Sequence, residues 1–246
     1  MVKVSIITVC FNSGKTISRT IEHVLRQTYP NIEYLIIDGG SKDNTVEIIK
    51  RYECLFEGRL KWVSEPDNGI YDAMNKGIKM ASGELIGISN SDDWLENDAV
   101  EKIIPYYKPD KKQIIYGAMS LRKDDEKWHK TVFINHECLY EENLPHPACF
   151  VSKSTYDAVG LYGEKYRLIA DYEFMLKAFE SKSVEFVPVN CLVANFTEGG
   201  ASSNIKCNIE LANLLYEYGC ISKKILIKRL VVLNLKKIFQ RFKLLG

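Results

Sequence analysis

The sequence predicts an α/β protein whose mostly parallel sheet is flanked by helices, and three observations support this fold class. Short apolar runs of strand length alternate with segments whose apolar residues recur at helical spacing. Acidic residues follow the strands instead of preceding them. Because the carboxyl ends of parallel strands meet at one edge of a sheet, the acidic residues predict a ligand site at that edge. The pattern covers roughly the first 105 residues.

The first strand and helix are separated by a turn. Val4–Cys10 is a continuous apolar run rich in β-branched residues, and the turn formers Asn12-Ser13-Gly14 end it. Residues 17–25 then carry apolar side chains at helical spacing. Pro30 ends this helix, since a proline disfavours helical geometry in the residue before it. Ile32–Ile37 follows as a second buried strand.

Two more helices and strands complete the predicted parallel sheet. Residues 46–49 continue as a helix, and Leu60–Val63 is a short strand. Ile70–Ala81 has one apolar and one polar face, as a helix packed on a sheet does. Leu85–Ile88 is the fourth strand, and it delivers the carboxylates of Asp92-Asp93 at its carboxyl end.

The second half has a looser pattern that predicts a mixed arrangement of strands and helices whose order the sequence does not give. The predicted helices are 97–106, 170–180 and 204–218, and the predicted strands are 114–121, 131–134, 184–187 and 191–196. Residues 144–151 lead into a further strand.

Composition sets the class of protein. With 246 residues, 46% of them apolar, the chain suffices for one large α/β domain or a domain with an appendage. The seven cysteines are scattered and lack metal-binding spacing, so we expect reduced thiols and a cytoplasmic protein. No signal peptide is expected, and no uncharged apolar run reaches the roughly 18 residues that a membrane span needs.

The basic charge is concentrated at the carboxyl terminus. The net charge is +1, yet the segment from Lys223 to the end holds eight Lys or Arg and no acidic residue. Apolar residues alternate with these bases, which predicts a basic amphipathic helix suited to the anionic inner face of the plasma membrane. A helix packed on the preceding α/β domain, with its basic face in solvent, is the alternative. Nucleic acid is not an expected partner, because the remaining chain is acidic on balance.

The acidic edge predicts how phosphate would be held. The chain has neither Gly-x-Gly-x-x-Gly nor Gly-Lys-Ser/Thr, so a glycine-rich phosphate loop is not expected. Asp92 and Asp93 have the chemistry to hold a divalent cation against phosphate oxygens. The alternative is that they form a cap cluster for the helix after them, since Ser and Asp are favoured caps.

Four blocks resemble, in order and spacing, the family 2 glycosyltransferases of bacterial surface-polysaccharide synthesis. These blocks are Val4–Asn12, Asp38–Thr45, Gly69–Gly77 and Asn90–Asp93, and the similarity covers residues 2–200. The resemblance implies a GT-A fold with a Rossmann-like sheet, a nucleotide-sugar donor, a divalent cation and inversion at the anomeric carbon. It divides the chain into a glycosyltransferase domain, 1–203, with a nucleotide-binding half, 1–105, and an acceptor half, 106–203. Residues 204–246 form C-terminal helices with the basic tail.

The resemblance also implies nucleotide contacts. Thr8 and Phe11 would lie against the nucleoside, with Phe11 where the family usually has Tyr. Asp38 resembles the carboxylate that accepts from the base N–H, a match for the N3–H of uracil or thymine, and its alternative role is a helix cap. Asp67 belongs to the loop that completes the nucleoside pocket, unless it only forms a turn. The roles of the motif residues Tyr71 and Asp72 remain open.

For the cation, the resemblance implies that Asp92 faces the ribose and that Asp93 binds Mn²⁺ or Mg²⁺. Both ions suit one or two carboxylates plus diphosphate oxygens. Ser91 stands where the family's aspartate-x-aspartate element has its first carboxylate, which is a departure from the pattern.

For catalysis, the resemblance implies that Asp171 is the base that takes the proton of the acceptor hydroxyl. Ala170 replaces the Glu that usually precedes it, and capping the helix is a compatible role. His146 would contact the acceptor or the donor sugar, or else be an ordinary loop histidine. Gly199–Ser203 resembles a segment that closes over the donor.

The sequence therefore predicts a metal-dependent inverting glycosyltransferase that uses a nucleotide sugar, with UDP as the expected nucleotide, to extend a glycan or lipid-linked acceptor. One alternative is a nucleotidyltransferase that makes nucleotide sugars, although residues 10–16 lack the glycine-rich basic loop it would need. The other is an inactive subunit that binds nucleotide sugars.

Overall fold

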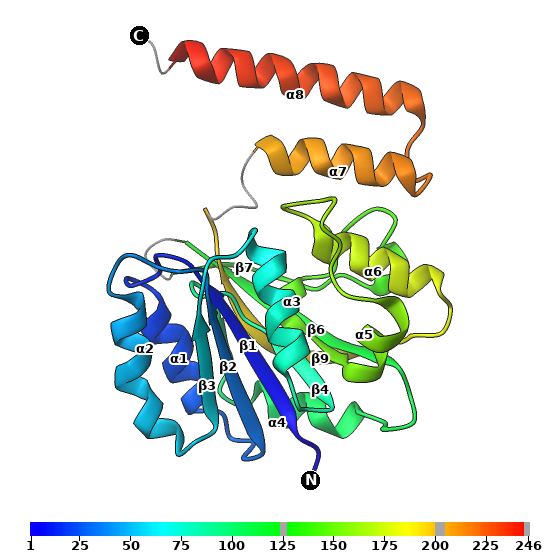
Figure 1. Ribbon diagram of the computed structural model, residues 1–246. Helices are drawn as coiled ribbons and strands as arrows, with labels where there is room; N and C mark the ends of the chain where they lie inside the picture. The colour runs from blue at the N-terminus through cyan, green and yellow to red at the C-terminus, as the bar shows by residue number, and fades with distance from the viewer. Residues whose placement is uncertain (124–126, 200–204, 244–246) are drawn as a thin grey trace.

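A computed structural model of the chain describes residues 1–123, 127–199 and 205–243 (Figure 1). Its centre is a nine-stranded sheet in the order β3-β2-β1-β4-β8-β6-β9-β5, with β7 paired to β6. Helices cover both faces of this sheet (Figure 1). The predicted mixed α/β class is confirmed.

The first half alternates strand and helix as predicted. β1 is parallel to both β2 and β4, and β2 is parallel to β3, so the carboxyl ends of all four strands meet at one edge. The elements are β1 (Val4–Cys10), α1 (Ile17–Leu25), β2 (Ile32–Asp38), α2 (Thr45–Glu53), η1 (Cys54–Phe56), β3 (Leu60–Ser64), α3 (Ile70–Met80) and β4 (Leu85–Ile88).

The central strands are buried on both faces, which explains their unbroken apolar sequence. All seven residues of β1 and all seven of β2 are buried. Helix α3 lies especially close to them at Gly77, where an added Cβ would be 2.5 Å from Cγ2 of Ile7. Glycine at this position lets the second half of α3 pack closely against the middle of β1.

The second half completes the sheet with antiparallel strands. β8 is antiparallel to β4 and β6, whereas β9 is parallel to β6. The elements are β5 (Trp94–Leu95), α4 (Ala99–Ile103), η2 (Ile104–Tyr106), β6 (Gln113–Arg122), β7 (Trp128–Val132), η3 (His136–Cys138), η4 (His146–Ala148), β8 (Cys149–Ser152), α5 (Lys153–Val159), α6 (Ala170–Glu180) and β9 (Glu185–Thr197).

Several predictions for this half were wrong in detail. β7 ends at Val132, whereas the predicted strand ran from 131 to 134. The strands predicted at 184–187 and 191–196 are one long strand, β9, because register shifts against β6 absorb the irregularity around Pro188. The sequence pattern also missed α5 and the two-residue strand β5.

Two hydrophobic cores lie on the two faces of the sheet. Side chains of α1, α2 and α4 pack with Ile6, Tyr34 and Ile36 on one face. Side chains of α3, α5 and α6 pack with Ile7 and Leu35 on the other. Successive residues of a strand point to opposite faces, so β1 and β2 contribute to both cores.

Two helices follow the sheet domain and stack at one end of it (Figure 1). α7 (Ile205–Glu217) packs on the domain through Leu214 and Leu215, which are buried. α8 (Lys223–Lys243) lies on the side of α7 that faces away from the sheet (Figure 1). Within the described ranges, the chain contains no helix long and apolar enough to cross a bilayer.

A buried carboxylate, Glu33, lies near the amino end of β2, away from the carboxyl ends that form the ligand edge. Its side chain is 3% exposed. It accepts hydrogen bonds from the backbone N–H of Ser82 (2.8 Å), from Ser5 Oγ (2.8 Å) and from Lys61 Nζ (3.1 Å). Burial opposes the charged form, but the hydrogen bonds from Ser82, Ser5 and Lys61 outweigh it and lower the pKa of Glu33 from 4.5 to about 2.

This carboxylate makes stability depend on pH in the acid range. Because its folded pKa is depressed, its stabilisation is complete above about pH 4.5 and is lost as the pH falls through about 2. Glu33→Gln should reduce the free energy of unfolding at pH 7 by about 1–3 kcal/mol, since a buried donor loses its acceptor. Its stability should also fall less steeply between these pH values.

Urea unfolding between pH 2 and pH 7 measures both effects. Asp98→Asn is the control, because Asp98 forms an exposed pair with Lys102 (2.7 Å) and such pairs contribute little. A Glu33→Gln protein with the pH dependence of the wild type would contradict this account.

Candidate active site

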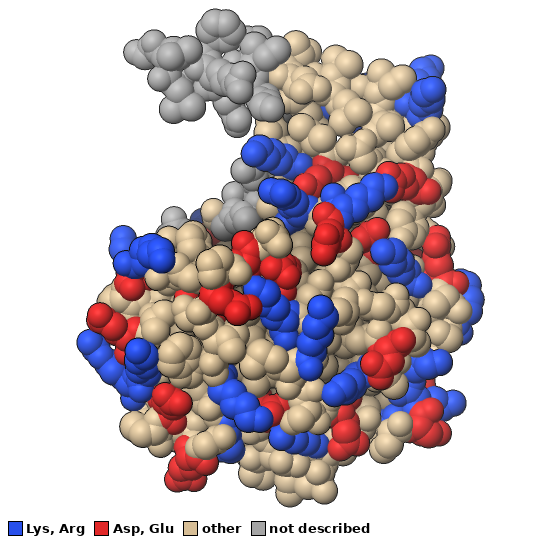
Figure 2. All heavy atoms as spheres, in the orientation of Figure 1, with Lys and Arg blue, Asp and Glu red and all other residues tan. Residues whose placement is uncertain are grey.

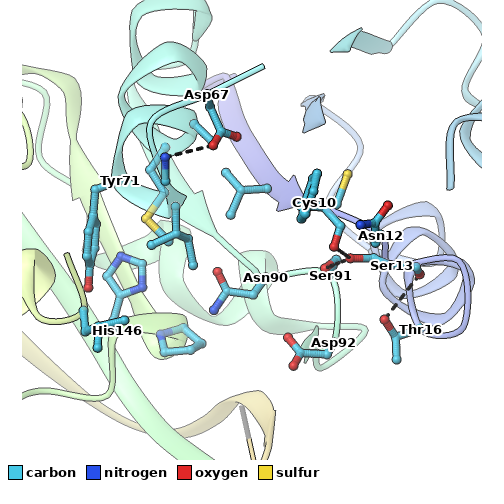
Figure 3. Close-up of a pocket in the computed structure, with 18 of the residues that line it drawn as sticks. Cys10, Asn12, Ser13, Thr16, Asp67, Tyr71, Asn90, Ser91, Asp92 and His146 are labelled. Atoms are coloured by element: carbon cyan, nitrogen blue, oxygen red, sulfur yellow. Dashed lines mark hydrogen bonds between the residues drawn. The ribbon is translucent and has the colours of Figure 1, made fainter. Parts of the chain in front are cut away.

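A cavity of about 810 Å³ lies at the carboxyl ends of the parallel strands (Figure 3). It is lined by segments from both halves of the chain, at residues 9–13, 15–16, 43, 67, 69–71, 73–74, 90–92, 146–147, 168, 171 and 196. The parallel register of β1, β2 and β4 brings the loops after these strands together at this edge. The cavity therefore lies at the edge of the sheet where the acidic residues after the strands predict a ligand site.

The loop after β1 presents an aromatic ring to the cavity. Phe11 lines the cavity and is 60% exposed. Asn12 next to it has a left-handed backbone (φ 50°), and its N–H donates to Ser41 Oγ (2.7 Å). Its side-chain oxygen accepts from the N–H of Lys42 (2.8 Å). These bonds fix the loop, so the exposed ring is a preformed surface for stacking a flat ligand.

Asp67 lies on the same side of the cavity, in the loop after β3. Its Oδ1 accepts from the N–H of Gly69 (2.9 Å), which holds the carboxylate at the start of α3. Gly39 in the neighbouring loop allows this approach, since an added Cβ there would be 2.5 Å from Asp67 Oδ2 and 3.4 Å from Cδ2 of Phe11. Three strand ends therefore converge on one corner of the cavity.

Thr8 and Asp38 lie behind the cavity wall, and neither lines the cavity. Thr8 is fully buried and accepts from Tyr34 Oη (3.0 Å). Asp38 accepts from the N–H of Ser41 (3.0 Å) and from Ser64 Oγ (2.6 Å), which fixes the turn after β2. Asp38 therefore stabilises its own turn and does not cap α2, whose N-cap position is Asn44. Its contact to the base stays a prediction.

Asp92 and Asp93, after β4, occupy different environments. Asp92 lines the cavity. Asp93 is 1% exposed and accepts from the N–H of Thr197 (3.0 Å) and from Asn90 Nδ2 (3.1 Å). Burial raises the pKa of Asp92, and burial together with the neighbouring Asp92 raises that of Asp93 well above its usual range. The guanidinium of Arg19 opposes both shifts.

Arg19 connects this acidic turn to the rest of the fold. Its guanidinium lies 3.9 Å from the ring centroid of Trp94 and donates to the backbone oxygen of Asp92 (2.7 Å). Thr197 Oγ1 donates to the same oxygen (2.6 Å). The end of β9, more than 100 residues along the chain, is thereby fastened to the turn after β4.

The side chains of this turn fit a divalent cation. Asn90 lines the cavity beside Asp92 (Figure 3), and its Oδ1 is buried without a hydrogen-bond partner. Among the residues that the structure describes, no group of three His, Cys, Asp or Glu could hold a metal by itself. Mg²⁺ and Mn²⁺ are commonly held by one or two carboxylates plus phosphate oxygens, so one carboxylate and one amide oxygen suffice if a diphosphate completes the shell.

The far side of the cavity belongs to the second half of the chain. Asp171, in the first turn of α6, accepts from Tyr71 Oη (2.6 Å) and from Asn143 Nδ2 (3.1 Å). His146 Nε2 is 2.9 Å from Tyr162 Oη. Burial lowers the pKa of His146, so its ring is neutral at pH 7.

The structure brings five of the predicted residues to the cavity, namely Phe11, Asp67, Asp92, His146 and Asp171. The predicted Gly199–Ser203 segment lies largely outside the described residues. Sequence reasoning gave no role to Asn90, although it stands two positions before Asp92, or to Asn143, which no motif marks. It left the role of Tyr71 open.

Comparison with known proteins identifies the family. Residues 5–155 match the family described as Glycosyl transferase family 2. The chain belongs to this family. A PGL/p-HBAD biosynthesis glycosyltransferase of Mycobacterium tuberculosis is 27% identical over 202 residues, which cover 81% of this chain and 78% of that protein. An uncharacterized glycosyltransferase of the same organism is 33% identical over 207 residues, covering 82% and 77%.

Solved structures confirm that the fold is GT-A. S. aureus TarS 1–349 in complex with UDP-GlcNAc has a TM-score of 0.68 at 16% identity, covering 87% of this chain and 65% of that one. A longer TarS structure is covered to 39%. The mannosyltransferase PcManGT from Pyrobaculum calidifontis, in complex with GDP-Man and Mn²⁺, has a TM-score of 0.67 at 14% identity, covering 94% and 70%. The chain is accordingly a glycosyltransferase.

Proposed function

We propose that this glycosyltransferase is metal-dependent and inverting, and that it moves a sugar from a nucleotide sugar to a glycan or lipid-linked acceptor in cell-surface polysaccharide synthesis. The observation that carries the proposal is that one cavity brings together the ring of Phe11, the carboxylates of Asp67 and Asp92, and the carboxylate of Asp171. A nucleoside, a cation-bound diphosphate and an acceptor hydroxyl would need groups of these kinds in one cavity.

The nucleoside end suits a uracil base. The exposed ring of Phe11 offers a stacking surface, and the carboxylate of Asp67 can accept from the N3–H of uracil or thymine. The complex of TarS with UDP-GlcNAc supports a UDP-sugar. The GDP-Man complex of PcManGT keeps GDP as the alternative nucleotide.

Asp92 and Asn90 would hold the cation, Mn²⁺ or Mg²⁺, with diphosphate oxygens completing its shell. When bound, the cation offsets the charge of the departing diphosphate. The Mn²⁺ in the PcManGT complex supports this choice. Asp93 has a supporting role in this scheme, since its carboxylate is bonded to Thr197 and Asn90.

Inversion requires a single displacement and one base. In this step the oxygen of the acceptor hydroxyl bonds to the anomeric carbon as the bond from that carbon to the diphosphate oxygen breaks. The electron pair leaves with the diphosphate, and Asp171 takes the hydroxyl proton. Asp171 suits this role because it is a cavity-lining carboxylate contributed by the second half of the chain.

Asp92→Asn should abolish cation-dependent donor binding. Wild-type protein should gain about 2.7 kcal/mol of stability with UDP-GlcNAc and Mn²⁺ at 100 times the dissociation constant, and the variant should lose most of the Mn²⁺-dependent part. Thermal shift with and without Mn²⁺ measures the gain. Asp93→Asn is the matched control: it should melt at a lower temperature yet keep the Mn²⁺ increment. The reverse pattern would assign the cation to Asp93.

Asp171→Asn should lower kcat by about 100- to 10,000-fold, the usual contribution of a general base, with donor binding unchanged. Asparagine has the same shape but cannot accept the proton. Rates come from transfer assays with purified acceptor fractions, and donor binding from the thermal shift. Full transfer by this variant would remove the base assignment.

Family membership sets aside the nucleotidyltransferase alternative. The alternative of an inactive subunit predicts that the purified protein neither transfers the sugar of a nucleotide sugar nor hydrolyses the nucleotide sugar. Turnover in the wild type would exclude that alternative, whichever side chain is the base.

We also propose that α8 rests on the anionic inner face of the plasma membrane, next to a lipid-linked acceptor. Five apolar side chains in its described part are each about half exposed, namely Ile225, Ile227, Val231, Val232 and Leu235. Figure 2 shows acidic and basic side chains intermixed over the body of the molecule. The described part of α8 carries basic residues among apolar ones and no acidic residue. No acidic residue follows Glu217, so the charge of this segment complements anionic lipid.

Changing Lys223, Lys224, Lys228 and Arg229 together to Gln should weaken binding to phosphatidylglycerol vesicles by more than about 100-fold, at about 1 kcal/mol per basic residue. The control changes four exposed lysines of the sheet domain, Lys42, Lys79, Lys111 and Lys130. Vesicle flotation at low and high salt measures the binding. Equal binding to phosphatidylcholine vesicles, or dimers formed through α8, would contradict the proposal.

A further inference from the structure

Tyr71 has a position that its motif did not explain. It lies in the first turn of α3, lines the cavity, and donates through Oη to Asp171 Oδ1 (2.6 Å). Its ring packs against that of Tyr162, with centroids 5.5 Å apart. The bond joins residues 100 positions apart and so connects α3 in the first half of the chain to α6 in the second.

The second oxygen of Asp171 is held from another direction. Asn143 Nδ2, in the loop between η3 and η4, donates to Oδ2 (3.1 Å). Two donors from different elements therefore fix both the position and the rotation of this carboxylate. A carboxylate oxygen can accept two hydrogen bonds, and each oxygen of Asp171 accepts one of those described here, so each retains a lone pair for an incoming hydroxyl.

Five titratable groups around Asp171 are neutral at pH 7. Burial lowers the pKa of His146 and raises the pKa values of the phenols and thiols around it. The phenols and thiols are Tyr71 in α3, Cys149 in β8, Tyr162 in the loop that precedes α6, and Cys207 in α7. The hydrogen bonds from Tyr71 and Asn143 therefore orient the carboxylate through neutral donors.

We propose that Tyr71 is the positioning residue for Asp171: its phenol holds the carboxylate so that a free lone pair of Asp171 faces the acceptor hydroxyl. This inference rests on the proposed role of Asp171 as the base. A base must be held in a narrow range of angles to take a proton during displacement, and a carboxylate on a flexible side chain without such bonds samples other rotamers.

Tyr71→Phe removes the donor and keeps the ring. We expect kcat to fall by about 10- to 100-fold while KM for the donor stays within about 2-fold, since positioning matters in the transition state and not in donor binding. The acid limb of kcat/KM should move up by about one pH unit, because a donated hydrogen bond favours the charged carboxylate.

Tyr162→Phe is the matched control. It removes a phenol from the same aromatic group, bonded to His146 and to Tyr156 Oη (3.2 Å) but not to Asp171. If Tyr71→Phe acted only by loosening the cavity, or if the acid limb of kcat/KM reported the titration of His146, Tyr162→Phe would move the acid limb as much as Tyr71→Phe does. We expect its acid limb to stay where the wild type has it.

A second measurement covers a Tyr71→Phe protein that folds poorly. Incorporating 3-fluorotyrosine at position 71 strengthens the donor, and the acid limb should then move to lower pH. Unshifted limbs in both proteins, or equal shifts in Tyr71→Phe and Tyr162→Phe, would overturn the inference. If Asp171→Asn abolishes transfer while these limbs stay unshifted, only the role of Tyr71 fails; if Asp171→Asn retains transfer, the base assignment fails first.

Discussion

The buried carboxylate of Asp93 joins the two halves of this protein. Its two hydrogen bonds, from the N–H of Thr197 and from Asn90, fasten the end of β9 to the turn after β4. An isolated buried carboxylate is unfavourable, so these bonds are a requirement of the fold. The same turn carries Asn90 and Asp92 into the cavity. The geometry of this part of the cavity therefore depends on a carboxylate that does not itself line the cavity.

The fold of the first half was predictable because its strands are buried on both faces and its helices are amphipathic. Runs such as Val4–Cys10 and Ile32–Asp38 have few other ways to be packed. The second half was less predictable for a physical reason: β9 passes through register shifts around Pro188, and β5 is two residues long. Residue propensities within a short segment do not predict how such strands pair, because contacts between residues far apart in the sequence determine the pairing.

For the site, the sequence indicated the edge of the sheet but not the direction of each side chain. Adjacent carboxylates such as Asp92 and Asp93 look equivalent in a motif, yet one lines the cavity and the other is bonded to Thr197. Asp38 likewise satisfies its own turn. Asn143 has no sequence signal, since its importance comes from a loop that folds back onto α6.

The hydrogen bond between the end of β9 and Asp93 has a consequence for the folding of the chain as it is synthesised. A nascent chain that has emerged only through β4 has both carboxylates of the acidic turn but lacks the Thr197 amide that one of them needs. The same partial chain lacks Asp171 and the wall near Phe196. The complete cavity therefore requires the chain through β9 to be in place beside β6, and a chain that ends after β4 has the acidic turn without the pocket around it.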